Sequence, residues 1–195
     1  MDREKRLRRV ALLCCHFARN CAYYRAGWDG KETKARNEFW ATVQGNFIDI
    51  AVLEWLKLFG DHKDKHHWRK IVEDKDSFKQ EMLAKCEISE SELAHTRDLL
   101  KEYRDKFIAH LDSEEMMCIP VLDIPIKVMK FYYEYIAHEL VETGLGDLPI
   151  DIELYYQSCF RAAKMRFGKQ KEVRFGREGA GLNGTKISEE ASPSF

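Results

Sequence analysis

The stretch Ile88–Asp112, with the sequence ISESELAHTRDLLKEYRDKFIAHLD, contains the best-marked helix start in the chain. Ser89 and Glu92 have the spacing of a capping box, in which a serine hydroxyl and a glutamate carboxylate each bind an amide of the first helical turn. Apolar residues flank the box at the positions of a hydrophobic staple, Ile88 and Leu93. The stretch therefore predicts a long helix from about Glu90 to Asp112.

On both sides of this helix, the apolar residues recur at spacings of three and four, which is typical of helices that bury one face. The first 119 residues contain no proline, so long helices are possible there. Pro125 suits the first turn of a later helix. The segments with this pattern are Arg3–Ala26, Phe39–Phe59, Ser77–Cys86, Ile126–Leu140 and Ile152–Arg166.

These helices predict an all-α fold, an antiparallel helical bundle of four to five core helices. The segment Phe39–Phe59 is apolar on nearly all sides and should be central. Residues 1–167 are long enough for a single domain with a real core. Residues 168–195 contain five of the eleven glycines and few large apolar side chains, which predicts a flexible C-terminal tail.

The nearly equal numbers of basic and acidic residues exclude a strong net electrostatic field around the protein. The chain has 32 Lys and Arg against 33 Asp and Glu, so any polyanion must bind at a local patch. No segment has the length of a membrane span or the pattern of a signal peptide, which predicts a cytoplasmic protein without a membrane partner. The six cysteines form no C-x-x-C pair and are expected to be reduced core residues.

The end of the Glu90–Asp112 helix carries residues suited to phosphate chemistry. Arg104 offers a permanently charged planar group for a phosphate, and His110 is the residue type that exchanges a proton near neutral pH. Asp105 can orient the arginine or the RNA by hydrogen bonds. Together, Arg104 and His110 fit cleavage of an RNA phosphodiester bond without a metal or other cofactor.

The run Tyr103–His110, YRDKFIAH, resembles the arginine, polar residue and histidine motif of HEPN domains, in the form found in abortive-infection and toxin members. In that family the motif ends the third core helix of a four-helix bundle, and another amphipathic helix follows. The resemblance covers about residues 37–142. It implies that Arg3–Ala26 and the residues after Asp151 are additions to the core.

The spacing also bears on assembly. Six residues along an α-helix advance about 9 Å and rotate by about 600°, which leaves Arg104 and His110 roughly 120° apart around the axis. A second copy across a two-fold axis would bring two of each into one cleft. The HEPN resemblance likewise implies a homodimer with a shared site.

The resemblance also implies an endoribonuclease with RNA as substrate, which leaves a 2′,3′-cyclic phosphate. Its implied setting is phage defence or a pair with an antitoxin protein.

Two neighbours of the motif are predicted to contact the substrate. Lys106 adds positive potential one turn before His110, where it also lowers the histidine pKa. Tyr103 is the second predicted contact.

Other interpretations stay open. His110 continues the apolar stripe of its helix and fits a buried, hydrogen-bonded histidine, while Arg104 fits a surface ion pair. The alternative function is a non-catalytic HEPN-like module for dimerisation or for binding a protein. A third hypothesis is a metal site in the loop Asp61–Trp68, which contains His62, His66 and His67 but matches no zinc spacing. The basic start Arg3–Arg9 fits either a solvated helix end or a contact to an RNA backbone.

Overall fold

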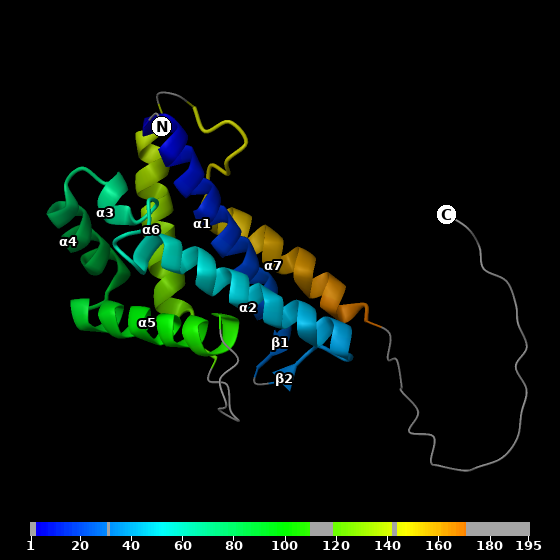
Figure 1. The fold of residues 1–195 in the computed structure, drawn as a ribbon. Coiled ribbons are helices and arrows are strands. Elements are labelled where there is room, and N and C mark those ends of the chain that lie inside the picture. The colour runs from blue at the N-terminus through cyan, green and yellow to red at the C-terminus, as the bar shows by residue number, and fades with distance from the viewer. Residues whose placement is uncertain (1–2, 31, 110–118, 142–143, 171–195) are drawn as a thin grey trace, which may run out of the picture.

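The computed structural model describes residues 3–30, 32–109, 119–141 and 144–170, and it confirms the all-α prediction (Figure 1). Within these ranges the chain forms a helical bundle and one two-stranded hairpin. The elements are α1 (Arg3–Ala26), β1 (Trp28–Asp29), β2 (Glu32–Thr33), α2 (Glu38–Phe59), α3 (Trp68–Ile71), α4 (Lys75–Cys86), α5 (Glu90–Tyr103), the π-helical segment η1 (Arg104–Ala109), α6 (Asp123–Glu139) and α7 (Ile152–Gly168). The predicted tail lies, from residue 171 on, outside the described residues.

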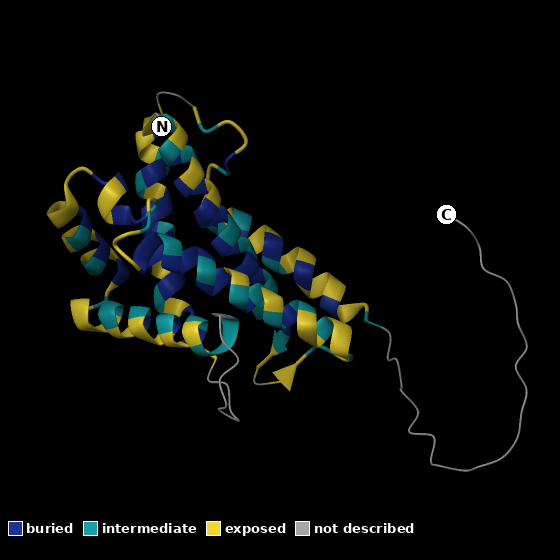
Figure 2. Ribbon diagram, in the orientation of Figure 1, coloured by how far each residue is buried: buried dark blue, intermediate teal, exposed yellow. Residues whose placement is uncertain are grey.

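Helix α1 lies at the centre of the core. It packs against α2, α6 and α7, and the side chains of Val10, Phe17 and Cys21 are fully buried. Small residues of α1, mainly alanine and cysteine, allow the neighbouring helices to approach closely. Helix α1 therefore supplies much of the buried apolar surface of the described residues (Figure 2), and its status as an addition to a HEPN-like core stays a prediction.

Helix α2 is buried mainly from Ala51 onward, and before that residue only Gln44 and Ile48 are buried. Asn37 caps its start by accepting a hydrogen bond from the backbone N–H of Trp40 at 3.1 Å. Val52, Trp55 and Leu58 are fully buried, whereas Phe39 is 68% exposed and Ile50 is 41% exposed. The prediction that this helix is central is therefore confirmed from Ala51 onward, whereas the part before Ala51 is only partly buried.

Gly60 ends α2 as predicted, and the reason is a close backbone approach. A β-carbon at this position would lie 2.5 Å from the carbonyl oxygen of Leu56, so a larger residue would force the chain to shift. In the hairpin of β1 and β2, glycine is favoured for a different reason. There, Gly30 has a φ of 61°, in the left-handed region that other residues rarely adopt.

The loop after α2 leads into two helices with side-chain caps. His67 caps α3, and Asp74 caps α4 by accepting from the backbone N–H of Ser77 at 3.0 Å. Trp68 of α3 stacks on Phe78 of α4 with ring centroids 5.2 Å apart. Helix α4 also packs against α6, so this part of the chain closes one end of the bundle.

Helix α5 starts as predicted and ends earlier than predicted. Ser89 and Glu92 form the complete capping box. The α-helical pattern stops at Tyr103, and the backbone continues as η1 to Ala109. Helix α6 carries Pro125 in its first turn, and α7 is capped by Asp151, which accepts hydrogen bonds from two backbone amides.

The cysteines agree with the prediction of reduced core residues where they are described. All five of these, Cys14, Cys15, Cys21, Cys86 and Cys159, are free and buried. Burial raises the pKa of the Cys15 thiol to about 11, which keeps it protonated and unreactive. The sixth, Cys118, lies outside the described residues. No helix in the described ranges is long and apolar enough to cross a membrane.

Candidate active site

The predicted motif lies where α5 passes into η1. A π-helical turn forms i to i+5 hydrogen bonds, and such turns are frequent at functional sites. Because each π-helical step rotates the chain less than an α-helical step, side chains in η1 are offset from the α5 pattern. The change begins at Arg104, the first residue of the motif, and η1 packs against α2.

Arg104 forms an ion pair with the next residue. Its Nε and Nη2 atoms each lie 2.7 Å from the same carboxylate oxygen, Oδ1 of Asp105. The side chain of Arg104 is 32% exposed and that of Asp105 is 57% exposed. Asp105 therefore holds the guanidinium, which is the contact expected both from an orienting role of Asp105 and from Arg104 as a surface ion pair. Since a guanidinium has five N–H donors, an anion can approach without first breaking the pair.

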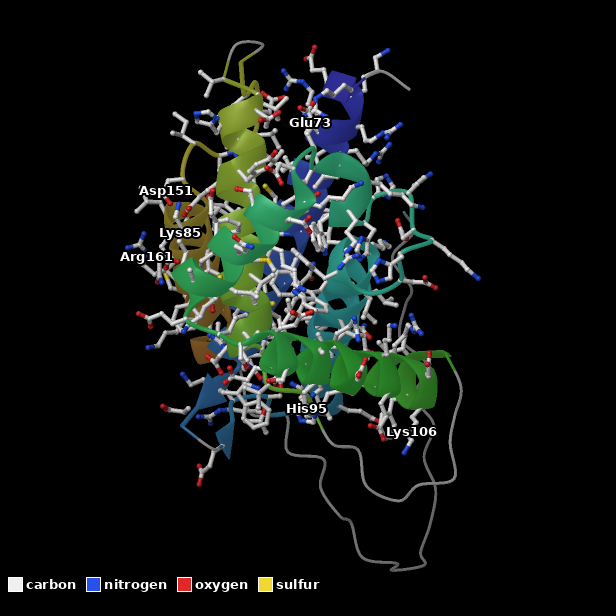
Figure 3. The ribbon with its side chains drawn as sticks, turned by 90° about the vertical axis from the view of Figure 1, so that its left-hand side faces the viewer. Glu73, Lys85, His95, Lys106, Asp151 and Arg161 are labelled. Carbon is white, nitrogen blue, oxygen red and sulfur yellow. The ribbon has the colours of Figure 1, made fainter. Side chains whose placement is uncertain are left out.

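Lys106 lies on the same turn and is also paired. Its Nζ atom is 3.0 Å from Oε1 of Glu102, one turn earlier on α5. Figure 3 shows Lys106 on the outer side of this helix, away from the bundle. Its position suits a contact with an incoming anion, although Glu102 reduces its charge locally.

Tyr103, which was predicted to contact the substrate, has little surface open to solvent. It is buried, and its hydroxyl donates a hydrogen bond of 2.7 Å to Oδ1 of Asp49 on α2. Burial and the Asp49 carboxylate both raise the pKa of Tyr103, so the hydroxyl stays protonated. Tyr103 thus fixes the end of α5 against α2, and its predicted substrate contact is restricted to the part of its ring that lines a surface hollow.

That hollow runs along the motif and has a volume of about 580 Å³. One wall comes from α5 and η1, and the other from the residues that lead into α6. The lining is mainly apolar, and its charged residues are Glu102, Lys106 and Asp123. It comprises Thr96, Leu99, Glu102, Tyr103, Lys106, Phe107, Ile119, Pro120, Val121, Asp123 and Ile124. A hollow of this size and character is suited to a small ligand or to one or two nucleobases.

His110 lies outside the described residues. The structure therefore brings together Arg104, Asp105, Lys106 and Tyr103, and the position of the histidine relative to them stays a prediction. Sequence analysis did not identify Asp49 or the second wall of the hollow. The signal for Asp49 was a single carboxylate within the apolar run Phe47–Ala51.

In the loop Asp61–Trp68 after α2, His66 and His67 contact other residues of the loop and of α3. His67 is 1% exposed, and its Nδ1 accepts a hydrogen bond of 3.2 Å from the backbone N–H of Arg69. Burial lowers the pKa of His67 to about 4. His66 pairs with Asp64. In the described part of the chain, no group of three or more His, Cys, Asp or Glu side chains is placed to hold a metal ion.

Comparisons of the chain with models of protein families, with curated proteins and with solved structures find no match.

Proposed function

We propose that the protein is a HEPN-type, metal-independent endoribonuclease. Arg104 would hold the charge that develops on the phosphoryl oxygens. His110 would take the proton of the 2′-hydroxyl or give one to the departing 5′-oxygen. The 2′-oxygen attacks phosphorus, the bond from phosphorus to the 5′-oxygen breaks, and the products are a 2′,3′-cyclic phosphate and a 5′-hydroxyl.

One observation carries this proposal most directly. Arg104 is a partly exposed arginine at the π-helical end of a capped helix and is held by Asp105. Its neighbours Tyr103, Lys106 and Phe107, but not Arg104 itself, line a hollow of about 580 Å³. The proposal puts a phosphate at Arg104 and a base of the same RNA in the hollow that the neighbours of Arg104 line.

A shared site requires two copies of the chain to meet near η1. Helix α2 offers a surface for this contact, because its apolar residues Phe39 and Ile50 are exposed and η1 packs against the same helix. We propose that the protein is a homodimer through this face, with Arg104 and His110 of both copies along one groove. Phage defence or a toxin–antitoxin pair, with a cognate antitoxin protein, is the biological setting that we propose.

The same exposed face favours a second candidate function. An apolar surface on α2 is also what a non-catalytic module would use to dimerise or to bind a protein. The two functions differ in what the motif does: the enzyme needs Arg104 and His110, and the module does not.

Alanine substitutions separate the two candidates. We expect Arg104→Ala and His110→Ala each to lower RNA cleavage by at least ~10²-fold, as for a lost charge stabiliser or acid–base group. Asp105→Asn should have a smaller effect, and EDTA should have none. If the wild-type protein cuts no RNA but still self-associates, and both alanine variants self-associate equally well, the module is the correct assignment.

A further inference from the structure

Two segments of the chain, 3–9 and 61–71, are rich in basic residues. The segments 3–9 and 61–71 together contain nine Lys and Arg against three Asp and Glu, whereas the whole chain has one more acidic than basic residue. The structure places these two segments next to each other: Nη1 of Arg3 lies 3.4 Å from the carbonyl oxygen of Ile71. Local positive potential therefore exists despite the balanced total.

A small hollow of about 180 Å³ lies between the two segments. Arg3, Arg6 and Lys70 line it around an apolar floor of Leu7 and Ile71, and no acidic side chain is among its described lining residues. Arg6 and Lys70 offer N–H donors to a phosphate group at this hollow, beside Arg3, which is also paired with Glu73 and Glu139.

The cations are held in place from outside the hollow. Arg3 pairs with Glu139 at 2.7 Å and with Glu73 at 3.2 Å. Figure 3 shows Glu73 beside the first turns of α1. The Nζ atom of Lys70 donates to the carbonyl oxygen of Lys63 at 2.6 Å. Arg6 has no carboxylate within ion-pair distance among the described residues, so its charge is not neutralised there.

More positive charge surrounds this hollow. Arg9, Lys63 and Lys65 are exposed, and none of them has an ion-pair partner among the described residues. Their proximity is visible in the pKa of His66, which burial lowers and which the charges of Lys65 and Arg9 lower further, against the opposite effect of Asp64. The positive surface thus extends from α1 across the loop to α3.

Helix stability does not explain this arrangement. The start of a helix carries partial positive charge from its free amides, so basic side chains are unfavourable there and acidic ones are favourable. In the first seven residues of α1, only Glu4 is acidic and five residues are basic. Two of the basic residues, Arg3 and Arg6, line the hollow instead of contributing to the core.

We propose that this surface, defined by Arg3, Arg6, Arg9, Lys63, Lys65 and Lys70, binds the phosphate backbone of RNA, with one phosphate in the hollow. RNA is favoured over an anionic membrane because the apolar residues here, Leu7 and Ile71, are buried and cannot insert into lipid. RNA as the polyanion rests on the proposed function, but binding at this surface does not require cleavage at Arg104.

The test is binding of a fluorescent single-stranded RNA to the full chain at several salt concentrations. We expect the double variant Arg6→Glu/Lys70→Glu to weaken binding by at least ~10-fold at low salt and to flatten the salt dependence by about two ions, since each phosphate contact releases roughly one. Arg161→Glu is the matched control, because Arg161 is an exposed arginine on α7, which Figure 3 shows away from Glu73. It should stay within about twofold of wild type.

Three outcomes would overturn the proposal: no binding of RNA by the wild type, equal weakening by the control, or tighter binding to phosphatidylserine vesicles or to an acidic polypeptide than to RNA. Melting temperatures exclude unfolding as the cause, since replacing basic residues at the start of α1 should not destabilise it. Arg104→Ala separates this proposal from the enzymatic one. If it binds RNA normally while wild-type protein cuts none, the basic surface stands and the ribonuclease assignment fails.

Discussion

Tyr103 makes the contact that fixes the end of α5, and Asp49 receives it. The hydroxyl oxygen of Tyr103 lies 2.7 Å from Oδ1 of Asp49. Tyr103 is buried and Asp49 is half-buried. Without the hydroxyl, the Asp49 carboxylate would lose this donor. Arg104 follows Tyr103 directly, so the geometry of the candidate site depends on this hydrogen bond.

Tyr103→Phe should lower the free energy of unfolding by about 1–3 kcal/mol, the usual cost of losing a hydrogen bond to a charged group. Urea denaturation measures this change. In a double-mutant cycle with Asp49→Ala, the second substitution should add less than it does alone. Strict additivity of the two changes would show that the two side chains do not interact.

His67 makes stability depend on pH. Its pKa in the folded protein is about 4, below the ordinary value of 6.5, so the folded state favours the neutral ring. The unfolded chain takes up a proton first as the pH falls. The stabilisation is therefore complete above pH 6.5 and is lost progressively down to about pH 4, by on the order of 3 kcal/mol.

Denaturation at several pH values tests this dependence. His67→Asn should remove most of the loss between pH 6.5 and 4, because asparagine can also cap α3 and does not titrate. The control is His95→Asn, since His95 is exposed on α5. If His67→Asn retains the wild-type pH dependence, another group is responsible.

At the scale of elements, the capping box of α5 determines where η1 and Arg104 lie. Ser89→Ala should lower the free energy of unfolding by about 1 kcal/mol. Ser89→Asp should keep most of the stability, because an aspartate also accepts from the first-turn amides. Thermal denaturation of both variants measures the difference. Equal loss in the two variants would indicate that the serine matters for a reason other than capping.

The helices were predictable where their signals are local. The box at Ser89, the stop at Gly60 and the repeating apolar residues of α1 and α6 depend only on nearby residues. The burial of α1 and the exposure of Phe39 depend on which helices become neighbours, and local periodicity does not contain that information. The residues of η1 are also compatible with an α-helix, so the local sequence does not predict the change to π-helical hydrogen bonding at Arg104.

In the candidate site too, only the contacts between residues close in the sequence were predictable. The ion pair of Arg104 with Asp105 joins consecutive residues, so the sequence suffices to suggest it. The hydrogen bond of Tyr103 to Asp49 joins residues 54 positions apart, and the hollow joins α5 to the start of α6. Such contacts follow from packing, which a motif of eight residues cannot specify.

At the scale of the whole molecule, the proposed site requires a dimer. We expect sedimentation to show a dimer at micromolar concentration and Ile50→Glu to shift it to a monomer, because a buried charge in an apolar contact is costly. Leu154→Glu is the matched control, since Leu154 is 65% exposed on α7, away from η1. A wild-type monomer, or a dimer that Ile50→Glu leaves intact, would contradict the assembly through α2.

The chemistry of the cut ends tests the central claim most directly. In the presence of EDTA, the wild-type protein should cut RNA to fragments with a 2′,3′-cyclic phosphate and a 5′-hydroxyl. It should leave the same RNA intact when every 2′-hydroxyl is methylated, because the attacking oxygen is then blocked. Cleavage of the methylated RNA, fragments with a 5′-phosphate, loss of cleavage in EDTA, or no cleavage at all would contradict a ribonuclease that acts through Arg104 and His110.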